Sequence, residues 1–170
     1  MRLYLLRHAI AVPHGAPGYA QDAKRPLTQE GLVQAREVGA GLKRLKISPE
    51  LILTSPYVRA AQTAEGVALA LGKKAPVREL GALIAETDPK ATSQALKEFS
   101  GCGELLLVGH EPHLSAWLAE LVAGPRSLQC NFKKAGVACV EVAQVPPPTG
   151  SGVLRWLLTP KQLTLIGLAT

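Results

Sequence analysis

The sequence predicts an α/β protein, a three-layer α/β/α sandwich with a mostly parallel central sheet. Short apolar runs alternate with segments of helical periodicity as far as Val122, as strands and helices do in successive βαβ units. The chain has 170 residues, of which 47% are hydrophobic, enough for one domain with a substantial core. Because no repeat or linker divides the chain, we expect a single domain over residues 1–170.

The chain opens with a strand and a helix. Arg2 to Leu6 is a short apolar run typical of a buried strand, and a loop rich in Pro and Gly follows over 13–27. Thr28 is a suitable N-cap for the next helix. The apolar residues of that helix recur at spacings of three and four, and they are Leu32, Ala35, Val38, Leu42 and Leu45.

A second strand and helix follow. Leu51 to Leu53 is the predicted strand, and Pro56 fits the first turn of a helix that runs to about Leu71. Gly72 fits the C-terminal stop of that helix. Val77 to Leu80 is predicted as a short strand, so the alternation continues.

The remaining elements complete the sheet. A weaker helix is predicted over Pro89–Phe99, a strong strand over Glu104–Val108 and another helix over Leu114–Val122.

After Pro125 the pattern changes to a hairpin at the sheet edge. Its strands are Val137–Val142 and Leu154–Leu158, separated by a surface loop at 146–152, and a terminal helical turn is predicted over Pro160–Leu165.

Composition excludes several classes of function. The net charge of +6 favours acidic partners, but aromatic residues make up only 4% of the chain, too few for a platform that stacks nucleic acid. The Lys133–Lys134 pair is expected to be a solvated turn. The apolar run at the N-terminus is too short for a membrane span or a secretory signal, so we expect a cytoplasmic protein with no membrane or nucleic-acid partner.

The three cysteines, Cys102, Cys130 and Cys139, have no metal-ligand or redox spacing, so we expect reduced thiols and no metal or cofactor. An apolar edge strand is compatible with a monomer or a weak dimer.

Polar residues follow three of the predicted strands. Arg7 and His8 follow the first strand, Ser55 and Arg59 follow the second, and His110 follows the strand that ends at Val108. Parallel strands bring their carboxyl ends to one edge of the sheet, where ligands bind in open α/β folds. The sequence therefore predicts one pocket that contains two arginines and two histidines.

This set of residues suits phosphoryl chemistry. A phosphoryl dianion needs several directed donors, and arginine supplies a planar fork that lysine cannot copy. A neutral imidazole can attack phosphorus and form a phosphohistidine intermediate. Ser55 has two interpretations, a phosphate donor or the N-cap of the following helix, and the cap is slightly favoured because helix starts leave unpaired amides.

Three motifs resemble one known family. The stretches LYLLRHA, LTSPYVRAAQTA and LLLVGHEP are similar to those of the histidine phosphatase superfamily, whose folds are phosphoglycerate-mutase-like. The segment from Asp22 to Thr28, followed by Gly31, and the short chain without a cap insertion resemble the phosphohistidine phosphatases of the SixA type. The resemblance spans about residues 2 to 122.

The resemblance implies a role for each matching residue. His8 would be the nucleophile, while Arg7, Arg59 and His110 would hold the phosphoryl oxygens, with His110 protonated or donating a hydrogen bond. Ala9, which we expect in the substrate pocket, replaces the glycine usual in the superfamily. Because alanine is also small, we expect this difference to be tolerated. Phosphate or sulfate is expected to bind there.

The general acid is the least defined part of the site. Asp22 and Glu79 are the candidates, and Glu86 lies in the same stretch as Glu79. Asp22 is also expected to bind substrate, and Glu111 could orient His110 or bind substrate. A strong acid is dispensable if the leaving group is an imidazole, whose protonation lies near neutral pH.

The sequence therefore predicts a metal-independent phosphatase that removes the phosphoryl group of phosphohistidine from a signalling or carrier protein. The alternatives are the same chemistry on a small phosphorylated metabolite or phosphosugar, and a non-catalytic module that binds phosphoproteins.

Overall fold

The computed structural model describes residues 1–72, 75–125 and 127–169, and these residues form a sheet between two layers of helices. The strands are β1 (Arg2–Arg7), β2 (Leu51–Thr54), β3 (Val77–Glu79), β4 (Glu104–Gly109), β5 (Val137–Glu141) and β6 (Val153–Leu158). The helices are α1 (Gln29–Arg44), α2 (Val58–Leu71), α3 (Pro89–Ala95), α4 (His113–Val122) and α5 (Pro160–Leu168). Three short 3-10 helices are η1 (Asp22–Lys24), η2 (Gly81–Leu83) and η3 (Leu96–Phe99).

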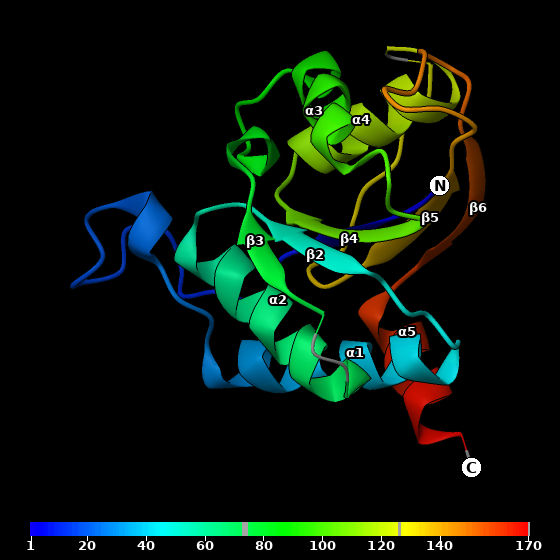
Figure 1. Ribbon diagram of the computed structural model, residues 1–170. Helices are drawn as coiled ribbons and strands as arrows, with labels where there is room; N and C mark the ends of the chain where they lie inside the picture. Colours follow the sequence, from blue (N-terminus) through cyan, green and yellow to red (C-terminus); the bar gives the residue numbers. More distant parts are fainter. Residues whose placement is uncertain (73–74, 126, 170) are drawn as a thin grey trace.

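The sheet has the strand order β3-β2-β4-β1-β5-β6. β3, β2, β4 and β1 run parallel, whereas β5 is antiparallel to both β1 and β6. Helices α3 and α4 cover one face of the sheet, and α1, α2 and α5 cover the other (Figure 1). The predicted three-layer architecture, with its mostly parallel sheet and edge hairpin, is confirmed.

The central strands are buried on both faces, because helices lie above and below them. In β1, Leu3 and Leu5 pack in the cluster shared with η3 and α4, while Tyr4 and Leu6 pack in the cluster shared with α1 and α2. This two-sided burial explains why the strand is a continuous apolar run rather than an alternating one. Each fully buried leucine stabilises the fold by about 1.5–3 kcal/mol.

Several helix boundaries follow the sequence pattern. The Thr28 side chain accepts a hydrogen bond from the Gly31 N–H at 3.0 Å, so the predicted N-cap of α1 is confirmed. Gly72 ends α2 with a φ of 66°, a left-handed conformation that favours glycine. α5 begins with a capping box between Thr159 and Gln162, and this cap supports a helix longer than the predicted turn.

Three predictions about the helices were wrong. Leu45, expected on the buried face of α1, is 40% exposed because the helix ends at Arg44. Pro56 is not in the first turn of α2, which begins at Val58. The single helix predicted over 89–99 is split into α3 and η3, where the backbone tightens at Leu96.

Three negative observations concern the described residues only. No helix among them is long and apolar enough to cross a membrane. Over the same ranges, no group of three or more His, Cys, Asp or Glu side chains is placed to hold a metal ion. The cysteines, all of which lie in the described part of the chain, are free.

Gly31 lets the start of α1 lie directly against the segment that follows β1. A Cβ atom at Gly31 would lie 1.9 Å from the backbone oxygen of Ile10. We therefore expect Gly31→Ala to lower the free energy of unfolding by about 1–3 kcal/mol, as overpacking does elsewhere. Urea denaturation measures this change. Gly81→Ala is the matched control, because nothing lies within 4 Å of that position, and equal losses in both variants would contradict the packing argument.

Candidate active site

Parallel pairing brings three strand ends together at the carboxyl edge of the sheet. Arg7 of β1 is in register with Gly109 of β4, and Thr54 of β2 is in register with Val108. Hydrogen bonding to β4 continues for one residue beyond β1 and β2. The N–H of His8 donates to the backbone oxygen of Gly109 at 3.0 Å, and the N–H of Ser55 donates to the backbone oxygen of Val108 at 2.9 Å. The side chains that follow these strands therefore share one site.

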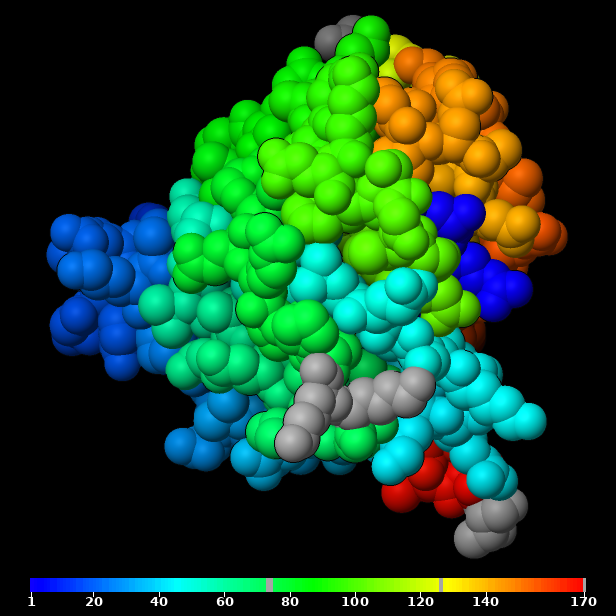
Figure 2. Space-filling view, viewed as in Figure 1, coloured from blue at the N-terminus to red at the C-terminus, as the bar shows by residue number. Residues whose placement is uncertain are grey.

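The loop that follows β1 stands beside this edge. It runs from His8 to Thr28, carries η1, and projects from the body of the molecule in the space-filling view (Figure 2). In the ribbon view the same loop lies next to the start of α2 (Figure 1). The candidate site is therefore bordered by α2 and by this projecting loop.

His8 is held with one ring nitrogen ready to react. The ring is 8% exposed, and its Nδ1 lies 2.8 Å from the backbone oxygen of Ala9. Because a carbonyl oxygen can only accept, Nδ1 carries the proton and Nε2 keeps its lone pair. Burial, together with the charges of Arg59 and Arg7, lowers the pKa of His8 to about 4. The imidazole is therefore neutral at physiological pH.

His110 faces His8 from the end of β4. The two ring centroids lie 5.1 Å apart, and His110 is 1% exposed. Burial, followed by the proximity of His8 and Arg59, lowers the pKa of His110 to about 2. Of the two states expected from the resemblance, the structure favours the neutral ring that donates a hydrogen bond.

Ser55 lies beneath His110 rather than capping α2. Its Oγ lies 2.8 Å from the Nε2 of His110 and accepts the N–H of Tyr57 at 3.3 Å. The N-cap of α2 is Tyr57, whose side chain makes no capping hydrogen bond. The slightly favoured cap interpretation of Ser55 was therefore wrong, because the hydroxyl lies two residues before the N-cap and faces His110.

Arg7 and Arg59 bring two guanidinium groups to the pocket. Arg7 Nη1 donates to the oxygen of Phe132 at 2.6 Å, and Arg59 donates from both terminal nitrogens to Asp22. The Nε atoms of both arginines and Nδ1 of His110 are buried and have no protein partner in the described part of the chain. Unpaired buried polar atoms are rare and costly, so this set of three nitrogens near His8, two of them guanidinium donors, indicates a site for an anion.

Asp22 is an anchor for Arg59. Its Oδ2 accepts from Arg59 at 2.9 Å, its backbone oxygen accepts from the same side chain at 2.8 Å, and its Oδ1 accepts from Arg25 at 2.8 Å. Partial burial works to raise the pKa of Asp22, but hydrogen bonds from Arg25 and Arg59 outweigh it and lower that pKa below its ordinary value. An ionised carboxylate held in this way is a poor proton donor.

The glutamates have different surroundings from those expected. The Glu111 carboxylate accepts hydrogen bonds from the N–H of Phe132 at 2.7 Å and the hydroxyl of Ser115 at 2.6 Å. Glu79 is exposed at the end of β3, in register with Thr54, and forms no hydrogen bond or ion pair within the described ranges. Over the same ranges, Glu111 forms no hydrogen bond or ion pair with either histidine ring.

The turn after His8 tolerates alanine. Ala9 is fully buried and does not have a positive φ, and its N–H donates to the Oγ1 of Thr63 at 3.0 Å. The hydroxyl of Thr63 in turn donates to the oxygen of Arg59 at 2.7 Å. α2 thus holds the backbone beside the nucleophile, as expected for a small residue at position 9.

Two parts of the site were not predicted. Tyr57 contacts both His110 and Arg59. The ring centroids of Tyr57 and His110 lie 4.9 Å apart, and the guanidinium carbon of Arg59 lies 4.9 Å from the centroid of the Tyr57 ring. The loop around Phe132 holds Arg7. Tyr57 lies in the stretch LTSPYVRAAQTA, two residues before Arg59, and this position could have identified it. The residues near Phe132 have no periodic pattern that could have identified them.

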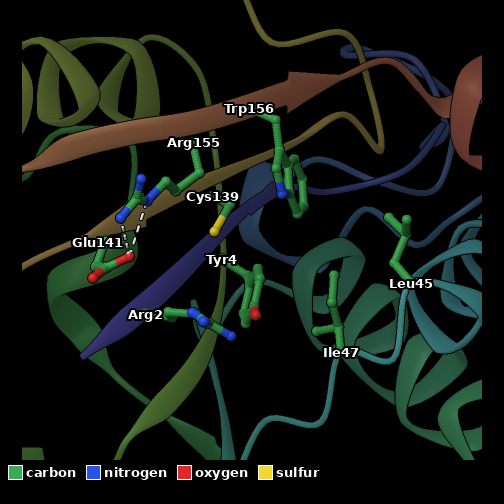
Figure 3. A pocket seen from close by; sticks show the side chains of 8 residues that line it. All are labelled: Arg2, Tyr4, Leu45, Ile47, Cys139, Glu141, Arg155 and Trp156. Atoms are coloured by element: carbon green, nitrogen blue, oxygen red, sulfur yellow. Dashed lines mark hydrogen bonds and ion pairs between the residues drawn. The ribbon is translucent and has the colours of Figure 1, made fainter.

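A second cavity of about 370 Å³ lies at the opposite edge of the sheet (Figure 3). Its cations are neutralised, because Arg155 pairs with Glu141 at 2.8 Å and Arg2 pairs with Glu104 at 3.2 Å. Burial raises the pKa of the Cys139 thiol there to about 11, so the thiol stays protonated. This cavity lacks the donors and the nucleophile that phosphoryl chemistry needs.

Comparison with known proteins agrees with this geometry. Residues 3–87 match the model of the histidine phosphatase superfamily (branch 1). The chain is 38% identical over 145 residues to an uncharacterised protein of Picosynechococcus, covering 81% of this chain and 82% of that one. It is 29% identical over 167 residues to the phosphohistidine phosphatase SixA of Escherichia coli, covering 97% and 98% of the two chains.

A solved structure gives the same result. The chain is similar to the protein histidine phosphatase SixA complexed with tungstate, with a TM-score of 0.82 and 29% identity over 96% of this chain and 99% of that one. The phosphoglycerate-mutase-like fold expected from the motifs is confirmed.

The protonation state of His8 can be measured directly. As the pH of the unliganded protein falls from 7 to about 5, we expect the His8 ring to stay neutral with its proton on Nδ1, because its folded pKa lies near 4. Nitrogen-15 NMR of the histidine side chains reports this state, and His8→Asn assigns the signal. A midpoint near 6.5 would contradict the burial argument.

Proposed function

The chain belongs to the histidine phosphatase superfamily (branch 1), and from this premise we propose that it hydrolyses phosphohistidine on a signalling or carrier protein through a phosphoryl intermediate on His8. Membership of the superfamily implies a phosphatase. The observation that carries the proposal is the neutral His8 ring, with its lone pair on Nε2, near three buried nitrogens that have no hydrogen-bond partner. Similarity to SixA over nearly the whole chain supports the phosphohistidine substrate.

In the first step, Nε2 of His8 attacks phosphorus, and the bond from phosphorus to the leaving nitrogen breaks. The electron pair of that bond goes to the leaving imidazole, which takes up a proton. Arg7, Arg59 and His110 would donate to the three phosphoryl oxygens from positions already set by the fold. Such preorganised donors stabilise charge at the transition state without reorganising.

In the second step, water attacks the phosphoryl group on His8, and the bond between phosphorus and Nε2 breaks. Inorganic phosphate leaves, and the neutral His8 is restored. The proton stays on Nδ1 of His8 throughout, hydrogen-bonded to the backbone oxygen of Ala9, so the ring keeps its orientation. The protein therefore contributes mainly position and charge.

The surroundings of the carboxylates support a substrate with an easy leaving group. Asp22 is engaged by Arg25 and Arg59, and Glu111 is engaged by Ser115 and Phe132, so neither offers a proton at the pocket. An alkoxide needs a general acid, whereas an imidazole can take a proton near neutral pH. This contrast favours phosphohistidine over the alternative, a small phosphorylated metabolite or phosphosugar.

A non-catalytic phosphoprotein-binding module is the other alternative. Anion binding would need the arginines but not a neutral imidazole with a free lone pair. The hydrogen bond that places the proton of His8 on Nδ1 favours catalysis over binding alone.

The decisive assay compares hydrolysis of a phosphohistidine-carrying protein, a phosphoserine peptide and a sugar phosphate. We expect phosphohistidine to be hydrolysed fastest, and His8→Ala to lower kcat/KM at least about 1,000-fold because the nucleophile is lost. Arg36→Ala is the control, because Arg36 is exposed on α1. Equal turnover by His8→Ala would refute the nucleophile, and faster hydrolysis of the sugar phosphate would favour the metabolite.

Metal dependence is a separate test. We expect metal-free protein in excess EDTA to retain full activity, because the proposed steps use only imidazole, guanidinium and water. The hydrolysis assay above measures this, before and after addition of divalent ions. Loss of activity in EDTA that a divalent ion restores would contradict the mechanism.

A further inference from the structure

A basic groove adjoins the candidate active site. It has a volume of about 710 Å³, and its lining includes Arg7 together with Lys133, Lys134 and Lys161. We name these three lysines and the space between them the lysine groove. Arg7 lines the groove and also belongs to the candidate anion site, so the two adjoin at this residue.

The position of the lysine groove is coupled to the catalytic residues. Arg7 Nη1 donates to the oxygen of Phe132 at 2.6 Å, and the N–H of Phe132 donates to Glu111 at 2.7 Å. Phe132 itself is fully buried, so the two lysines that follow it start from a fixed backbone. Lys134 is close enough for its charge to contribute to lowering the pKa of His8.

The charges of the groove are not neutralised within the protein. Over residues 1–72, 75–125 and 127–169, the side chains of Lys133, Lys134 and Lys161 form no ion pair and no hydrogen bond. All three residues are exposed. By contrast, Arg25, Arg59 and Arg155 each pair with a carboxylate. The groove is therefore a site of unpaired positive charge beside the reacting atoms.

The kind of cation in the groove indicates the kind of ligand. A small phosphate is usually held by buried, directed donors such as those of Arg7 and Arg59, whereas exposed lysines act as mobile point charges. Such charges attract an extended acidic surface and speed its association. The half-buried side chains of Ile10 and Pro160 add apolar contact area to the same groove. A polypeptide offers both kinds of contact.

We propose that the lysine groove binds an acidic polypeptide surface next to the phosphohistidine of the substrate, and so selects a protein substrate over a small one. This inference rests on the proposed phosphohistidine phosphatase function. It revises the expectation that Lys133–Lys134 is only a solvated turn: the pair does lie at a turn, but the turn borders the site.

The test uses two synthetic phosphohistidine peptides, one flanked by glutamates and its twin flanked by glutamines. The protein variant combines Lys133→Ala, Lys134→Ala and Lys161→Ala. The matched control combines Lys43→Ala, Lys90→Ala and Lys97→Ala, which removes the same charge from exposed positions elsewhere. The measured quantity is the ratio of kcat/KM for the glutamate peptide to that for the glutamine peptide.

We expect this ratio to fall about tenfold in the groove variant and to stay within about twofold in the control. The wild-type ratio should also fall as salt is raised, because the lysines are exposed. An unchanged ratio in the groove variant would overturn the inference. The inference would also be overturned if the groove substitutions lowered kcat/KM more for a sugar bisphosphate than for the glutamate peptide. The groove would then hold a second phosphate.

A binding measurement separates this inference from the proposed function. Fluorescence anisotropy gives the Kd of each peptide for the His8→Ala protein, with and without the three groove substitutions. If wild type hydrolyses neither peptide, the phosphohistidine substrate is refuted, and the groove is still judged by Kd. The inference about the groove is supported if the His8→Ala protein binds the glutamate peptide more tightly and the groove substitutions abolish this preference. Equal affinities of the His8→Ala protein for the two peptides would refute it.

Discussion

The site depends above all on the parallel pairing of β4 with both β1 and β2. This pairing places Arg7 in register with Gly109 and Thr54 in register with Val108, and therefore brings His8, Ser55 and His110, which follow these strands, to one edge of the sheet. Since side chains alternate across a strand, a slip of one residue in either register would turn the side chains of the candidate site to the wrong face. Burial of β1 and β4 on both faces is what specifies the register.

Electrostatic order within the pocket follows from this placement. Two imidazoles are buried beside two guanidinium groups, and burial favours their neutral forms. Asp22 supplies the counter-charge for Arg59 from the projecting loop, on the side away from its free Nε. The outcome is a neutral imidazole beside fixed cations, a combination that suits the proposed attack on a phosphoryl dianion.

Segments outside the sheet adapt this chemistry to a substrate. The loop after β1 holds Arg59 through Asp22, and the segment around Phe132 holds Arg7 through its backbone oxygen. Both segments therefore reach the candidate anion site through arginine, although they lie far apart in the sequence. The lysine groove begins where the second segment meets Arg7, so the proposed recognition of a partner and the proposed binding of the phosphoryl group would share one residue.

Local signals in the sequence determined the order and type of elements, the N-cap at Thr28 and the stop at Gly72, because capping and periodicity act over a few residues. Strand ends in the correct order also predicted His8, Arg7, Arg59 and His110 as neighbours. Only the tertiary structure decided the hydrogen-bond partners: Ser55 with His110, Asp22 with Arg59, Glu111 with Phe132, and Lys133 and Lys134 beside Arg7. These contacts join residues distant in the chain, so no local pattern encodes them.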